Sequence, residues 1–189
     1  RAGLSSRVVK AGFYRWAEGS DVIVCIALAV DDEAVAIAMR GANVTRMVRI
    51  ALERPEVDKS KLILLGRSLG GGVACGVGGR VPPAAMILEC TFSSLAAMAD
   101  GYHVPRWLVR HPFLNDEALK AIKAPVLLAH GEHDRVIPIA HAEALKKARP
   151  DAELIRLDCD HNDLPGKDEG RYRVEFEGFL RRAGLWPGK

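Results

Sequence analysis

A serine flanked by glycines stands where a short apolar run is expected to turn into a helix. The sequence Gly66-Arg-Ser-Leu-Gly70 follows the run 61–65 and precedes the small residues of 70–79, which favour a helix packed tightly on a sheet. Such a turn lifts a serine hydroxyl clear of a sheet, and the helix behind it aims backbone N–H groups at the reacting carbon. The spacing predicts Ser68 as a nucleophile and the Leu69 N–H as an oxyanion donor. An ordinary glycine-rich turn is the alternative.

A serine nucleophile needs a base, and the base needs an acid that orients it. Asp134 follows the apolar run 125–130, and His161 follows the run 152–157. Loops at the carboxyl ends of parallel strands gather at one edge of the sheet, so we expect Asp134 as acid and His161 as base beside Ser68. A lone loop aspartate is more often a cap and a lone histidine more often solvated, so the prediction depends on all three positions. The rival acids are Glu132, Asp160 and, less favoured, Asp163.

A metal site in these loops is the competing interpretation. The candidate ligands are His130, His133, Cys159 and His161. Their spacing is not typical of a structural zinc site. We therefore expect no metal and no other cofactor.

The elements that must hold these residues alternate along the chain. Strands are expected at 22–30, 61–65, 84–89, 125–130 and 152–157, and helices at 33–53, 70–79, 140–148 and 171–183. Gly41, Asn43 and Thr45 weaken the middle of the stretch 33–53, so one broken helix or two short ones are expected there. The alternation predicts an α/β fold, a three-layer α/β/α sandwich with a mostly parallel central sheet. We expect one domain over 1–189, with 95–123 as a short lid-like segment.

Composition limits the classes of partner. The chain has 189 residues, 49% of them hydrophobic and 27% charged, with a net charge of +3, which favours neither disorder nor nucleic-acid binding. The cysteines at 25, 75, 90 and 159 form no Cys-x-x-Cys pair, so reduced thiols and a cytoplasmic location are expected. The apolar run 22–30 is too short to span a bilayer, which needs about 20 residues. Any membrane association is expected to be peripheral, and the oligomeric state stays open.

Four segments form one combination of motifs: Gly66-Arg-Ser-Leu-Gly-Gly-Gly-Val-Ala74, Ile87-Leu-Glu-Cys-Thr-Phe-Ser-Ser-Leu95, Ala124-Pro-Val-Leu-Leu-Ala-His-Gly-Glu-His-Asp134 and His161-Asn-Asp163. Together they resemble the ABHD-type, serine-aminopeptidase-like α/β hydrolases over residues 54–184. The His-Asn-Asp sequence marks the subgroup with membrane-associated depalmitoylases and bacterial relatives. The resemblance implies the α/β-hydrolase fold with Ser68 as nucleophile, Asp134 as acid, His161 as base and the Leu69 N–H as an oxyanion donor, without a cofactor. The order serine, aspartate, histidine is also that of the family.

The first third of the chain departs from that family. Members carry a His-Gly-type loop that supplies a second oxyanion N–H, and no such sequence precedes Ser68. Residues 13–20 resemble at most a degraded form of the family's Tyr-Arg-Gly-Tyr-Gly stretch. We therefore expect an N-terminally truncated or rebuilt chain that lacks the first strands. Removing one oxyanion donor costs about 10²–10³ in kcat, so the source of the second donor matters.

The expected reaction is hydrolysis of an ester or thioester on a small molecule or an acylated protein. Ser68 attacks the carbonyl carbon, His161 takes the proton, and water later releases the acyl group. Tyr102, Trp107 and Phe113 are candidate acyl-chain contacts, with core packing as an equal alternative. The alternative functions are a serine peptidase and a catalytically impaired module that acts by binding or as a scaffold.

Overall fold

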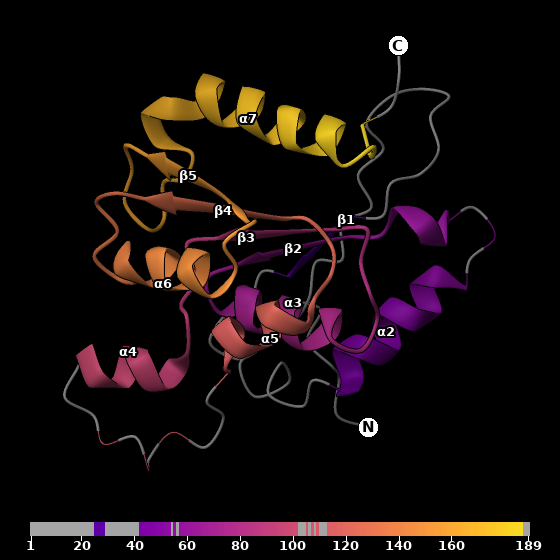
Figure 1. Cartoon of the computed structure of the whole chain (residues 1–189), viewed down its shortest axis with the longest axis horizontal. Coiled ribbons are helices and arrows are strands. Elements are labelled where there is room, and N and C mark those ends of the chain that lie inside the picture. Colours follow the sequence, from indigo (N-terminus) through magenta and orange to yellow (C-terminus); the bar gives the residue numbers. More distant parts are fainter. Residues whose placement is uncertain are drawn as a thin grey trace, which may run out of the picture.

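In a computed structural model, the chain forms a five-stranded parallel sheet with helices on both faces (Figure 1). The structure describes residues 25–28, 42–53, 55, 57–101, 105, 107, 109 and 113–186. The strands are β1 (Cys25–Leu28), β2 (Ile63–Arg67), β3 (Ala85–Glu89), β4 (Val126–Gly131) and β5 (Glu153–Leu157). They lie side by side in chain order, and each pairs in parallel with the next.

The helices divide unequally between the two faces. They are α2 (Ala42–Leu52), α3 (Leu69–Gly78), α4 (Leu95–Gly101), α5 (Asn115–Ala121), α6 (Ala140–Ala148) and α7 (Glu169–Arg182), with short 3₁₀ turns η1 (Lys59–Lys61) and η3 (Gly166–Asp168). Right-handed crossovers that always step in one direction place their helices on one side of a sheet. Accordingly α2, α3, α5 and α6 lie on one face, and α7, which follows the last strand, lies on the other (Figure 1).

The sheet separates two hydrophobic clusters because side chains alternate along each strand. One cluster packs Leu64, Met86 and Leu128 of the sheet against α2, α3, α5 and α6. The other packs Ile63, Ile87 and Leu127 against α7. Both faces of the central strands are thus buried, which explains why their sequences are continuously apolar rather than alternating.

The close approach of α3 to β2 depends on glycine. A Cβ atom at Gly66 would lie 2.5 Å from the carbonyl oxygen of Gly70 and 2.7 Å from the Cα of Gly71. These are backbone atoms that cannot move away without shifting the helix. Gly66 therefore sets the distance between the strand and the helix that flank Ser68.

The predicted parallel three-layer arrangement is confirmed, with differences at the element ends. Strand β2 runs to Arg67 rather than stopping before Gly66, because its pairing with β3 continues to Glu89. Helix α2 passes through Asn43 and Thr45 without a break, and Thr45 is buried there, so packing prevails over weak helix propensity. The rest of the predicted segments 22–30 and 33–53, and residues 13–20, lie outside the described residues.

The segment predicted as a short lid contains α4 and α5. Of its aromatic residues, Tyr102 lies outside the described residues, and the side chain of Trp107 is 81% exposed. Phe113 packs edge-on against Phe92, with 6.3 Å between ring centroids. Acyl-chain contacts of Trp107 and Phe113 stay predictions. Within the described ranges, no helix combines the length and the apolar character that crossing a bilayer requires.

Candidate active site

Ser68 occupies a sharp turn between β2 and α3. Its backbone angles are φ 52° and ψ −123°, a region that residues with a side chain rarely adopt. The N–H of Ser68 donates to the Glu89 carbonyl at 2.8 Å, and Thr91 Oγ1 donates to the Ser68 carbonyl at 2.7 Å. These two bonds tie the turn to β3 and its following loop. A strained turn fixed in this way holds a hydroxyl above the sheet edge.

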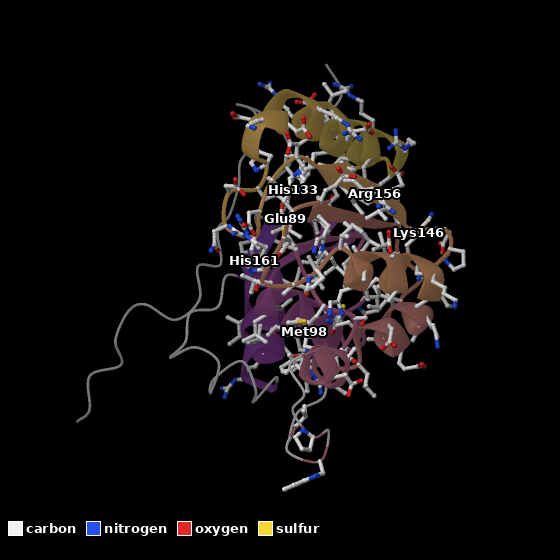
Figure 2. All side chains as sticks on the ribbon, turned by 90° about the vertical axis from the view of Figure 1, so that its left-hand side faces the viewer. Glu89, Met98, His133, Lys146, Arg156 and His161 are labelled. Atoms are coloured by element: carbon white, nitrogen blue, oxygen red, sulfur yellow. The ribbon has the colours of Figure 1, made fainter. Side chains whose placement is uncertain are left out.

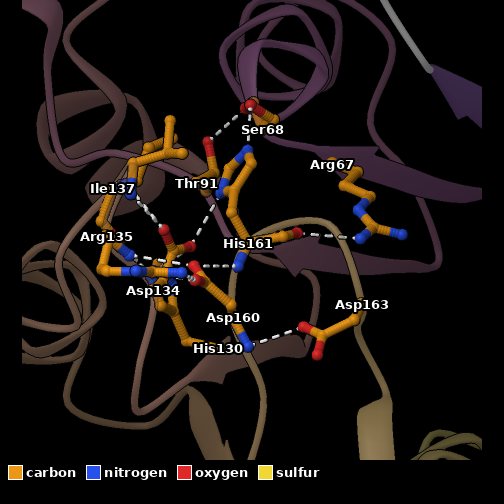
Figure 3. A network of polar contacts seen from close by, with 11 residues as sticks. Arg67, Ser68, Thr91, His130, Asp134, Arg135, Ile137, Asp160, His161 and Asp163 are labelled. Atoms are coloured by element: carbon orange, nitrogen blue, oxygen red, sulfur yellow. Dashed lines mark hydrogen bonds and ion pairs between the residues drawn. The ribbon is translucent and has the colours of Figure 1, made fainter.

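Three side chains from three loops form one chain of hydrogen bonds at the carboxyl ends of the strands (Figure 3). His161 Nε2 lies 3.0 Å from Ser68 Oγ, and His161 Nδ1 lies 2.7 Å from Asp134 Oδ2. When Nδ1–H is donated to the carboxylate, Nε2 is left to accept the serine proton. Asp134 and His161 are both buried, which shields this contact from water. The structure therefore brings together the three residues singled out in the sequence.

The carboxylate of Asp134 is also fixed through its other oxygen. Oδ1 accepts the backbone N–H groups of Val136 at 2.9 Å and Ile137 at 2.7 Å. His130 Nε2 lies 2.7 Å from the Ile137 carbonyl oxygen and 3.4 Å from Asp134 Oδ2. Burial lowers the pKa of His130 and so favours a neutral ring, which donates its Nε2–H to the Ile137 carbonyl oxygen. These contacts aim Oδ2 at His161.

The peptide groups on either side of His161 are also hydrogen-bonded to side chains. The His161 N–H donates to Asp160 Oδ1 at 2.7 Å, and its carbonyl accepts from Arg67 Nη2 at 2.9 Å. Asp160 also accepts from Arg135 N at 3.1 Å and from Arg135 Nε at 2.8 Å. Hydrogen bonds from the His161 and Arg135 backbone lower the pKa of Asp160 to about 2. Asp160 thus binds backbone and arginine rather than the imidazole, although it was a rival acid on sequence grounds.

The other rival acids lie away from the imidazole. Asp163 Oδ1 accepts the N–H of Asp160 at 2.6 Å, which places it inside the same loop. Glu132 is exposed to solvent. The ring nitrogen of His161 therefore meets Asp134.

The backbone amide of Leu69 opens α3 directly after Ser68. The first N–H groups of a helix have no acceptor within it, and the helix dipole is positive at that end. An oxyanion on an acyl carbon bound to Ser68 would meet this amide. Its role as a donor stays a prediction.

Metal-ligating atoms lie close together at one place in the described part of the chain. Cys90, Asp134 and His161 each offer one such atom within 4.8 Å of the others. Asp134 and His161 already bond to each other, and burial raises the pKa of the Cys90 thiol to about 12, which keeps the sulfur protonated and a poor ligand. His133, a ligand candidate in the sequence, pairs instead with Asp158 at 3.0 Å on the surface. The arrangement suits proton transfer better than metal binding.

A second polar cluster beside the site was missed by sequence reasoning. Arg67 and Glu89 end neighbouring strands and are partners in the β2–β3 register. The Tyr172 hydroxyl of α7 donates to Glu89 Oε1. Burial raises the pKa of Glu89, against the effects of the Tyr172 hydrogen bond and the Arg67 charge. Figure 2 shows Glu89 and His161 at the same end of the sheet.

A shallow hollow lies beside the loop that carries His161. It has a volume of about 460 Å³ and is lined by Arg135, Val136, Asp160, Asn162 and Asp163. Its walls are the loops that carry Asp134 and His161.

The chain resembles known proteins in part of its sequence and in its fold. No family model matches the chain. It is 33% identical over 127 residues to the uncharacterised protein Rv2307c of Mycobacterium tuberculosis, across 64% of this chain and 44% of that protein. It is also 33% identical over 111 residues to the α/β hydrolase domain-containing protein WAV2 of Arabidopsis thaliana, across 49% of this chain and 36% of that protein. The chain spans about half or less of the length of these curated relatives.

A solved structure shares the fold. The esterase domain of a Rhodothermus marinus protein matches with a TM-score of 0.57 and 21% identity, over 75% of this chain and 68% of that chain. At that identity the likeness concerns the fold. With the parallel sheet and the strained turn between β2 and α3, it shows that this chain has the α/β-hydrolase fold.

Proposed function

We propose that this chain is the core of a serine hydrolase that cleaves an ester or thioester, with Ser68 as nucleophile, His161 as base and Asp134 as acid. One observation carries the proposal: an unbroken chain of hydrogen bonds, 3.0 Å and 2.7 Å long, from Ser68 Oγ through both nitrogens of His161 to Asp134. The similarity to WAV2 and the fold shared with an esterase domain support the same class.

The reaction has two halves with the same base. Ser68 Oγ attacks the carbonyl carbon while His161 Nε2 takes its proton, and the Leu69 N–H meets the oxyanion. The intermediate expels an alcohol or thiol, which receives that proton from His161, and an ester on Ser68 remains. Water then attacks this ester, His161 takes a proton from the water, and Ser68 recovers it as the carboxylic acid leaves. Asp134 keeps the imidazole in the correct tautomer and stabilises its positive charge.

Esters and thioesters suit this site better than amides. An alcohol or thiol leaves more readily than an amine, so less stabilisation of the oxyanion is needed. The turn between β2 and α3 provides one oxyanion donor, the Leu69 N–H. Where stabilisation of the oxyanion is critical, removal of a single donor costs about 10²–10³ in kcat. The open hollow beside His161 allows an acyl group carried by a small molecule or by a protein surface.

Labelling with a fluorophosphonate serine-hydrolase probe tests the nucleophile. The wild type should label, and Ser68→Ala and His161→Ala should each lose labelling. Ser60→Ala and His133→Ala are matched controls because both residues lie exposed on the surface. They should label like the wild type. If folded wild-type protein stays unlabelled, the enzyme proposal fails and the binding or scaffold alternative takes its place.

A substrate panel separates the remaining classes. p-Nitrophenyl esters, acyl-CoA thioesters and aminoacyl p-nitroanilides differ in the atom that leaves. We expect turnover of the first two, abolished by Ser68→Ala. Turnover of the anilides alone would point to a peptidase instead.

A further inference from the structure

We propose that Arg67 is a positioning residue for His161 and that Glu89 and Tyr172 hold Arg67 in place. The inference rests on the proposed function, because Arg67 acts through the base of that reaction. The observation behind it is that Arg67 directly precedes Ser68 in the sequence, whereas its side chain is hydrogen-bonded to the backbone of His161. No substrate contact is assigned to Arg67.

The pleat of β2 explains how the end of this strand directs Ser68 and Arg67 to different places. Side chains alternate between the faces of a strand, so Ile63 and Leu65 pack on the α7 side, and Arg67 continues that row. Gly66 belongs to the opposite face, against α3. The chain thus delivers the Ser68 hydroxyl above the sheet edge and the Arg67 guanidinium toward the His161 loop. Nη2 donates to the His161 carbonyl at 2.9 Å (Figure 3).

Glu89 is the partner that accounts for a charged group at this position. Arg67 and Glu89 are directly paired across β2 and β3, so their side chains leave the sheet on the same face. Glu89 is buried, and a buried carboxylate is costly unless it is paired and hydrogen-bonded. The Tyr172 hydroxyl donates to Glu89, and the Arg67 charge also favours its ionised form, although burial outweighs both and raises the pKa of Glu89. Tyr172 belongs to α7, so the cluster joins the helix to both central strands.

As a consequence, the backbone of His161 is hydrogen-bonded on both sides of its Cα atom. Asp160 fixes its N–H and Arg67 fixes its carbonyl. The backbone between these bonds sets the direction in which the imidazole leaves the chain. Since a misplacement of about 1 Å far from the chemistry can cost on the order of 10²-fold in rate, loss of one hold should reduce the rate without changing substrate binding.

The kinetic test compares Arg67→Met with Arg80→Met. Arg80 also donates to a backbone carbonyl, that of Gly76 at 3.3 Å, but lies exposed at the end of α3. With p-nitrophenyl acetate, Arg67→Met should lower kcat by about 10- to 100-fold with KM unchanged. Arg67→Lys, which keeps a donor and a charge, should restore part of the loss. Arg80→Met should match the wild type.

A spectroscopic readout tests positioning without activity. The proton shared by His161 Nδ1 and Asp134 should give a low-field proton NMR signal in the wild type and in Ser68→Ala. Arg67→Met and Tyr172→Phe should shift or broaden that signal, and Arg80→Met should not. Tyr172→Phe also guards against a folding defect, because it removes a single oxygen.

The outcomes for the two proposals are separable. If Arg67→Met leaves both kcat and the NMR signal unchanged, or raises KM alone, the positioning role is overturned although the hydrolase stands. If the signal depends on Arg67 but the wild type neither labels nor turns over ester, the hydrolase is overturned and the positioning role is supported.

Discussion

The two aspartates that contact His161 belong to neighbouring loops and differ in nearly every physical respect. Asp134 has a side chain with 0% exposure, and it meets the imidazole Nδ1. The side chain of Asp160 is 30% exposed, meets the backbone N–H of His161, and pairs with Arg135, which is 88% exposed. Both follow a strand and both sit within hydrogen-bonding distance of the same residue. Position in the chain therefore does not distinguish them, whereas burial and the atom they contact do.

This difference implies that Asp134 acts on the imidazole through its charge, whereas Asp160 acts by fixing the backbone of His161. A buried carboxylate against the ring acts on the imidazolium across a medium that screens charge weakly. The charge of Asp160 is partly neutralised by Arg135 and screened by water, so its field at the ring is small. Asp160 contributes by fixing the loop backbone. Four changes, taken from the largest expected effect to the smallest, test this distinction.

Asp134→Asn should lower kcat by about 10⁴-fold, because an amide at that position favours the wrong tautomer of the histidine. The measurement is turnover of p-nitrophenyl acetate, with a thermal melt as the control for folding. A folded variant that keeps more than a tenth of the activity would mean that the buried carboxylate is dispensable.

Gly131→Ala should push apart the loops that follow β4 and β5, at the point where they leave the sheet. An added Cβ would collide with the carbonyl oxygen of Cys159, a backbone atom of the loop that follows β5. We expect a loss of about 1–3 kcal/mol in the free energy of unfolding, measured in urea. Gly76→Ala is the matched control, since its Cβ would meet nothing within 4 Å, and it should be neutral or stabilising. Equal effects of the two changes would refute the close contact.

Asp160→Asn should change kcat by no more than about fivefold, because an exposed ion pair contributes little and the amide oxygen can still accept the His161 N–H. The same ester assay applies, so the ratio to Asp134→Asn is read directly. A loss of a hundredfold or more in the folded variant would show that Asp160 acts on the ring, and the distinction would fail.

The stability contributed by Asp160 should depend on pH in a defined direction. Its pKa is lowered from 3.8 to about 2, so the unfolded chain binds its proton more readily than the folded one. The contribution is therefore present above the ordinary value and is lost as pH falls toward about 2. Urea unfolding of the wild type and Asp160→Asn at successive pH values should give a difference that shrinks over this range. A constant difference would assign the stabilisation to another group.

The sequence was sufficient to predict that Ser68, Asp134 and His161 lie together, because each position can be read from its own segment. Ser68, Asp134 and His161 each follow an apolar strand, and parallel strands place such positions at one edge. The choice of Asp134 over Asp160 could be made only by preference, since burial and the exact direction of a side chain depend on packing between loops.

The polar cluster under the site could not be predicted in the same way. Recognising Arg67 and Glu89 as partners requires the register between β2 and β3, which neither strand encodes alone. Tyr172 enters from a helix about 80 residues further along the chain. A signal was nevertheless present, because each strand is apolar on the α7 face until its last residue, which is charged. A charged residue at the end of a row of buried apolar side chains on one face of a strand indicates that an opposite charge lies nearby.

The order of the strands also determines when the site is complete during synthesis. Strands lie in the order in which they are made, and His161 follows Ser68 by 93 residues. A growing chain thus presents the Ser68 turn long before His161 has been added, and α7 covers the apolar face of Ile63 and Ile87 after the five described strands have been made. Until β5 and α7 have been made, the nascent chain lacks His161 and exposes an apolar face of the sheet, which favours aggregation. A break in the chain between α3 and β5 would separate His161 from the Ser68 turn.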